Sequence, residues 1–142
     1  MRVTEVISTT VVIPLRNVTS FSTRTVSERH YSLVKIRTEE GTEGLGFCYC
    51  GNGAGWVVTT IVRDLLARHV VGKDSHNTEA IWDAMYRDAI LMGRRGAVIR
   101  AMSAIDIALW DANAKEAELP LYRYLGSYYQ DIVPAYASGG YY

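Results

Sequence analysis

The chain has 142 residues, with 15 Lys and Arg against 15 Asp and Glu, so its formal net charge is zero. Hydrophobic residues make up 49% and charged residues 21%, which is typical of a globular chain rather than a disordered one. The balanced charge gives no basic footprint for nucleic acid, and no apolar run is long enough to span a bilayer. The N-terminal residues do not have a signal-peptide pattern, so we expect one mature, cytoplasmic domain.

The first third of the chain predicts three strands. Residues 3–13 are rich in β-branched side chains and end at Pro14, and residues 31–38 and 43–49 are also strand-like. Turn residues around Gly41 favour a hairpin between the second and third strands. The Ser/Thr-rich residues 16–25 predict a loop between the first and second. We therefore expect a three-stranded antiparallel meander.

A glycine-rich segment, residues 50–55, separates these strands from the helical part. It lacks the Gly-Lys-Ser/Thr of a nucleotide-binding P-loop, so a flexible connector or a substrate-covering lid is the better interpretation. Apolar residues then recur at three- and four-residue steps over 56–70, 78–89 and 98–112, which predicts three amphipathic helices. Strands followed by helices indicate an α+β fold.

Residues 132–139 form one more strand-like segment at the C-terminal end of the chain. A buried, apolar strand needs neighbours, and the meander cannot easily accommodate it. The pattern therefore predicts that this strand belongs to a second structural unit whose other strands are missing.

Few residues have the spacing of a catalytic site. Asp106 and Asp111 lie about 140° apart around a helix, so they predict structural salt links, and Lys115 is placed to pair with Asp111. Arg94 and Arg95 could grip an anion, but a structural role is favoured.

The cysteines and histidines do not form a recognisable constellation either. Cys48 and Cys50 predict free thiols packed in a sheet, and a zinc site is disfavoured because no second ligand pair has suitable spacing. The histidines, His30, His69 and His76, lie on three different predicted elements, so no Ser/His/Asp arrangement can be argued from their spacing.

The third predicted helix and the segment after it carry a pattern of small, acidic and apolar residues. The residues of this pattern are Ala101, Ser103, Ala104, Ile105, Asp106, Ala108, Leu109, Asp111, Ala114, Lys115, Pro120, Leu121, Leu125 and Gly126. Together they resemble the mandelate racemase/muconate lactonizing group of the enolase superfamily. The strand region, with Leu33 to Thr38, Gly41 and Gly44 to Gly46, also looks like the family's sheet. The chain departs from the family's usual pattern at Tyr124, where leucine is usual, and at Ala114, where glycine is common.

This resemblance implies an enolase-like N-terminal capping domain over residues 1–130, followed by the first strand of a TIM-type barrel over residues 131–142. Family members abstract a proton α to a carboxylate and stabilise the product with Mg²⁺. Their catalytic bases and metal ligands lie on later barrel strands, so the resemblance assigns no catalytic residue and no metal ligand to this chain. It does suggest substrate-facing positions in residues 16–25, residues 49–56 and the last strand, namely Phe21, Thr23, Tyr49, Trp56 and Ser138.

The resemblance favours a parent enzyme that is a Mg²⁺-dependent sugar-acid dehydratase. A racemase or epimerase is the second choice and a cycloisomerase the third. A catalytically inactive cap that serves as a binding or assembly module is the alternative from another class. The expected partners are a small carboxylate substrate, further copies of the protein in a homo-oligomer, and a second chain carrying the barrel if the barrel is separate. Neither nucleic acid nor a membrane is expected.

Overall fold

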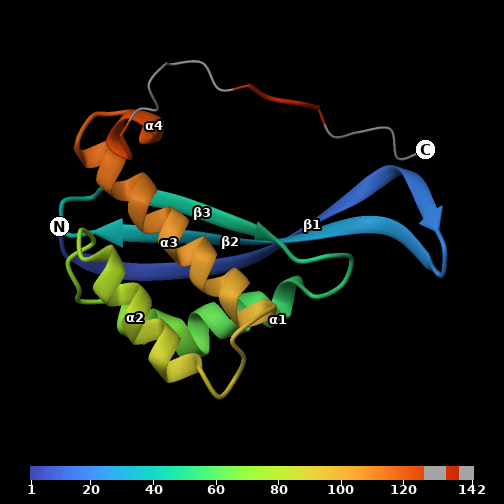
Figure 1. Cartoon of the computed structure of the whole chain (residues 1–142), viewed down its shortest axis with the longest axis horizontal. Coiled ribbons are helices and arrows are strands. Elements are labelled where there is room, and N and C mark those ends of the chain that lie inside the picture. The colour runs from blue at the N-terminus through green and yellow to red at the C-terminus, as the bar shows by residue number, and fades with distance from the viewer. Residues whose placement is uncertain (127–133, 138–142) are drawn as a thin grey trace.

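The computed structural model describes residues 1–126 and 134–137. A three-stranded antiparallel sheet forms one layer and the helices form the other (Figure 1). The strands are β1 (Val3–Phe21), β2 (Arg24–Thr38) and β3 (Glu43–Tyr49), and they pair in chain order. The predicted meander is therefore confirmed. No helix in the described residues is long and apolar enough to cross a membrane.

The predicted loop over residues 16–25 is wrong. β1 and β2 both continue through this region and close a long hairpin in which Phe21 pairs with Arg24. Pro14 does not end β1, because an edge strand tolerates a residue without an N–H, and the ladder shifts register between Pro14 and Thr19 instead. The Ser/Thr-rich composition that suggested a loop is equally compatible with an exposed two-stranded arm. Figure 1 shows this arm projecting past the helices.

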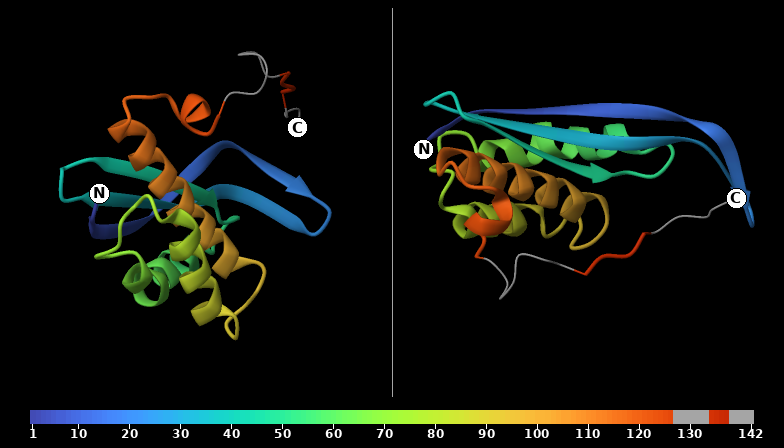
Figure 2. Two further views of the ribbon diagram at one scale, coloured as in Figure 1. Left: turned by 60° about the vertical axis from the view of Figure 1, so that its left-hand side comes forward. Right: turned by 90° about the horizontal axis from the view of Figure 1, so that it is seen from above.

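The helical layer covers one face of the sheet, as the right-hand view of Figure 2 shows. Residues Gly55–His69 are helical throughout, as α1 (Gly55–Thr60), a π-helical stretch η1 (Ile61–Leu66) and a 3₁₀ turn η2 (Ala67–His69). They are followed by α2 (Thr78–Ala89), α3 (Ala97–Glu116) and the short α4 (Leu121–Tyr124). The predicted helical segments are confirmed, although the π geometry is not visible in the sequence. Asn77 precedes α2, and its side chain makes no capping hydrogen bond.

The core lies between the sheet and the helical layer, and α3 contributes many of its residues. Val34 and Ile36 lie on one face of β2 and are fully buried. All the apolar residues predicted for one face of α3 are buried, namely Val98, Ala101, Met102, Ile105, Ala108, Leu109 and Ala112. Small residues on α3 face Gly44 and Gly46 of β3, and a Cβ added at either glycine would lie 2.0 Å from an α3 carbonyl oxygen. The helix and the strand therefore pack backbone against backbone.

The predicted barrel strand over residues 131–142 lies outside the described residues, apart from residues 134–137. Those four residues have neither helix nor strand structure. The proposed domain boundary at residue 130 stays a prediction.

Candidate functional site

Two segments that the sequence singles out lie at the same end of the sheet. The arm formed by β1 and β2 projects there, and the glycine-rich loop, residues 50–54, connects the end of β3 to α1 close to its base (Figure 1). The side-chain amide of Asn52 donates a hydrogen bond to the carbonyl of Thr25, at 3.4 Å. The loop and the arm are thus in direct contact.

The base of the glycine-rich loop is held by backbone hydrogen bonds to His30 of β2. The N–H of His30 donates to the carbonyl of Gly51 at 2.7 Å, and the N–H of Cys50 donates to the carbonyl of His30 at 2.8 Å. Arg100 of α3 adds a side-chain hydrogen bond, from Nη1 to the carbonyl of Tyr49, at 2.7 Å. The loop is therefore fixed at its start by the sheet and by α3.

His30 also lies against the start of α1. Its ring is largely buried, and Nε2 lies 2.8 Å from a carboxylate oxygen of Glu28. A Cβ at Gly55 would lie 2.6 Å from the Thr10 side chain and 3.1 Å from the Cβ of His30. Only glycine allows α1 to begin this close to the sheet.

The predicted substrate-facing residues lie on different parts of the domain. Tyr49 is 46% exposed on the sheet face that the helices leave open, where its ring packs against Tyr31 with centroids 5.5 Å apart. Trp56 is 64% exposed at the start of α1. Thr23 is exposed in the turn that closes the arm, and Phe21 is the last residue of β1. Ser138 lies outside the described residues.

The structure contains hydrogen bonds that the sequence analysis missed. Asn52, His30 and Arg100 fix the glycine-rich loop, yet Arg100 lies 51 residues from its partner Tyr49. Contacts at such a separation in sequence leave no local pattern. The Asn within a glycine-rich segment was the only available signal, because Asn is a common turn residue.

The thiols beside the loop are free, as predicted. The Sγ atoms of Cys48 and Cys50 lie 3.7 Å apart. Burial is the main cause that raises the pKa of the Cys48 thiol to about 12, and the neighbouring Cys50 adds to it. Cys48 is therefore protonated at neutral pH and is a poor nucleophile.

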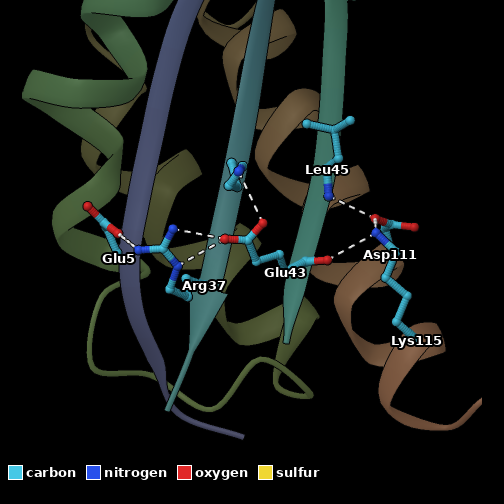
Figure 3. A network of polar contacts seen from close by, with 7 residues as sticks. Glu5, Arg37, Glu43, Leu45, Asp111 and Lys115 are labelled. Atoms are coloured by element: carbon cyan, nitrogen blue, oxygen red, sulfur yellow. Dashed lines mark hydrogen bonds and ion pairs between the residues drawn. The ribbon is translucent and has the colours of Figure 1, made fainter. Parts of the chain in front are cut away.

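Carboxylates at the opposite end of the sheet are engaged in structural ion pairs (Figure 3). Arg37 bridges Glu5 and Glu43, at 2.8 Å to each, and this pairing lowers the pKa of Glu43. Asp111 accepts hydrogen bonds from the N–H of Leu45 at 2.8 Å and from Lys115 at 2.6 Å. The predicted link between Asp111 and Lys115 is confirmed, but Asp106 forms no ion pair with a described residue.

The residues present do not fit a magnesium site. Residues 1–126 and 134–137 contain no group of three His, Cys, Asp or Glu side chains arranged to hold a metal ion. Each histidine instead contacts a carboxylate near it, with His69 against Asp88 and His76 against Asp74. We therefore assign no metal-dependent step to these residues.

The meander, the helical layer and the loop at the end of β3 match a known domain family. Residues 3–126 match the family described as mandelate racemase/muconate lactonizing enzyme, N-terminal domain. The chain belongs to this family. Its fold is the enolase-type N-terminal capping domain, as the sequence predicted.

Relatives of this capping domain catalyse different reactions. The chain is 40% identical over 113 residues to D-mannonate dehydratase from Rhizorhabdus wittichii, covering 79% of this chain and 27% of that protein. It is 39% identical over 106 residues to 3,6-anhydro-alpha-L-galactonate cycloisomerase from Streptomyces coelicolor, covering 75% of this chain and 29% of that protein. The chain thus spans less than a third of these relatives.

A solved structure of similar fold adds a third activity. The crystal structure of a racemase from Streptomyces coelicolor A3(2) with bound magnesium superposes with a TM-score of 0.85 at 33% identity. The superposition covers 89% of this chain and 36% of the racemase chain. Dehydratases, racemases and cycloisomerases therefore share this capping domain, so the domain alone does not specify the reaction.

Proposed function

We propose that this chain is the N-terminal capping part of a magnesium-dependent enzyme that removes the proton α to the carboxylate of a sugar acid. Dehydration is the favoured outcome. The observation that carries the proposal is the match to the family over residues 3–126, together with 40% identity to a D-mannonate dehydratase. The catalytic acid and base and the ligands of the magnesium ion are proposed to lie outside these 142 residues.

The proposed role of this chain is to cover and select the substrate. The arm and the glycine-rich loop lie at one end of the sheet and contact each other through Asn52 and Thr25. Segments that close over a site exclude water and position the substrate, and a polar arm rich in Ser and Thr suits a polyhydroxy acid. We propose that Phe21, Thr23, Tyr49, Trp56 and Ser138 contact the substrate from these segments.

Racemisation or epimerisation and cycloisomerisation are the competing reactions. They are favoured by the structural similarity to a racemase and by the 39% identity to a cycloisomerase. The whole enzyme is also proposed to be a homo-oligomer that takes a small carboxylate as its substrate.

An activity screen separates dehydration from racemisation or epimerisation. Protein purified from cells that make it would be incubated with Mg²⁺ and a panel of sugar acids. Dehydration of a sugar acid yields a keto acid, which a carbonyl reagent detects, whereas racemisation changes optical rotation without forming a new carbonyl group. A keto acid that forms only in the presence of Mg²⁺ supports the proposed dehydratase. A change in rotation alone would replace it with the racemase, and no change with any sugar acid would refute the sugar-acid proposal.

A further inference from the structure

A groove with acidic and aromatic walls runs between α2 and α3. It holds a shallow, solvent-open cavity of about 290 Å³. Thr78, Glu79 and Trp82 of α2 form one wall, and Asp106 and Trp110 of α3 form the other. Because residues four apart lie above one another on a helix, Trp82 stands above Thr78, and Trp110 stands above Asp106. None of these five residues belongs to the candidate site described above.

Asp106 contributes to this groove a carboxyl group that forms no ion pair with a described residue. Its side chain is about half buried, and burial raises the pKa of its carboxyl, while a hydrogen bond with Trp110 opposes that rise. Neither Asp106 nor Glu79 forms an ion pair with a residue in the described part of the chain. Asp111, five residues along the same helix, is paired with Lys115. A bound cation would offset the partial desolvation of the Asp106 carboxylate.

The two tryptophans restrict which cation fits. Trp82 and Trp110 are both partly buried, and Tyr124 of α4 packs edge-on against Trp110 with ring centroids 5.9 Å apart. This contact supports one wall of the groove. A cation that lies against an indole is favoured when it is weakly hydrated. Guanidinium meets this condition better than ammonium, and its planar array of N–H donors matches a carboxylate.

We propose that this groove binds a guanidinium group, with Asp106 as its ion-pair partner and with Trp82 and Trp110 as its aromatic walls. The group could belong to a free guanidino compound or to an arginine side chain of a polypeptide. The chemistry of recognition is the same for both sources. The proposal is independent of the proposed enzyme activity, because it involves neither the carboxylate substrate nor magnesium.

Tryptophan fluorescence of the 142-residue chain tests the proposal. The sequence has three tryptophans, so a Trp56→Phe background leaves only Trp82 and Trp110 to report. The probe is arginine amide, titrated at constant ionic strength, with lysine amide as the comparison. We expect a saturable change with arginine amide in the millimolar range, and a half-saturation concentration about fivefold higher for lysine amide. A folded chain with no saturable response to arginine amide would overturn the proposal.

Variants locate the response in the groove. Asp106→Asn keeps the shape of the side chain and should weaken binding of arginine amide about tenfold. Asp83→Asn is the matched control, because Asp83 lies on α2 with a 56% exposed side chain and pairs with Arg87 instead. Trp82→Leu is a second test from the opposite wall and should also weaken binding. Unchanged affinity in a folded Asp106→Asn variant, or in a folded Trp82→Leu variant, would contradict the assignment.

A further titration distinguishes the two sources of the group. A blocked Gly-Arg-Gly tripeptide presents the same side chain within a backbone. Tighter binding of the tripeptide than of arginine amide would indicate a polypeptide partner. Equal or weaker binding would indicate a free guanidino compound, and the guanidinium site itself is supported in either case.

Discussion

Gly46 shows how closely α3 approaches the sheet. A Cβ at this position would lie 2.0 Å from the carbonyl oxygen of Ala104 and 2.8 Å from the backbone nitrogen of Ala108. Both of these atoms belong to the helix backbone, which cannot move without disturbing the whole of α3. The small residues of the family pattern along α3 therefore set the distance between the two layers of the domain.

Gly46→Ala should lower the free energy of unfolding by about 3 kcal/mol, because the extra methyl group overpacks a buried helix–strand contact. Urea denaturation followed by circular dichroism would measure the loss. Gly53→Ala is the control, since a Cβ at Gly53 meets no atom within 4 Å. If the two variants were equally stable, the close packing of α3 on β3 would be wrong.

The burial of Asp106 predicts how the stability of the folded protein changes with pH. Its folded-state pKa is raised, so the folded protein holds this proton more tightly than the unfolded chain does. Stability from this residue is therefore fully present below the ordinary carboxyl pKa of 3.8 and is lost as pH rises through the higher folded-state value. At pH values above the folded-state pKa, the folded wild-type chain carries a partly buried negative charge at Asp106.

Asp106→Asn removes this charge, so its stability relative to wild type should increase as pH rises from 3 towards 7. Thermal or urea unfolding of both proteins across this range would test it. The Asp83→Asn variant, which alters an exposed ion pair, should not show the same trend. A constant difference between Asp106→Asn and wild type at every pH would contradict the uncompensated burial of Asp106.

The glycine-rich loop depends on α3 as well as on the sheet. The Arg100 guanidinium holds the carbonyl of Tyr49, the last residue of β3, just before the loop begins. Arg100→Ala should remove about 1 kcal/mol of local stability, which corresponds to roughly fivefold faster amide exchange over residues 50–54. Hydrogen exchange with mass spectrometry would measure this rate. Arg94→Ala, in the exposed turn between α2 and α3, is the control and should leave exchange in the loop unchanged.

Local patterns predicted the strands and helices that have one buried face. The bounds of β3 and the buried face of α3 follow from alternation and from three- and four-residue spacing, because burial imposes those periods directly. The arm was missed because both of its faces are exposed, so its Ser and Thr residues carry no alternation. Pro14 predicts the end of a strand by its missing N–H, although an edge strand tolerates proline.

The candidate site was harder to predict because its contacts join residues that are far apart in the sequence. Hydrogen bonds such as those of Arg100 and Asn52 join residues far apart in the sequence and leave no period. The resemblance to the enolase superfamily identified the two relevant segments. It did not reveal that Tyr49 packs on Tyr31 at the open sheet face while Trp56 lies on α1.

At the scale of the whole molecule, the described residues form a capping domain. No cluster of three metal-binding side chains occurs in residues 1–126 and 134–137, and the carboxylates around Arg37 and Lys115 are engaged in structural ion pairs. Calorimetric titration of the 142-residue chain with Mg²⁺ should therefore show no stoichiometric, tight site. The same chain should not turn over sugar acids. A tight site with one ion per chain would contradict the proposed division between cap and catalytic part.

We propose that this chain is the capping part of an enzyme whose catalytic residues lie elsewhere. The most direct test is the intact mass, under denaturing conditions, of the protein fraction that carries Mg²⁺-dependent sugar-acid activity in cells producing this chain. We predict that the active fraction contains a polypeptide much heavier than 15.8 kDa, the mass of these 142 residues. A fraction that is active and contains only the 15.8 kDa species would contradict the claim.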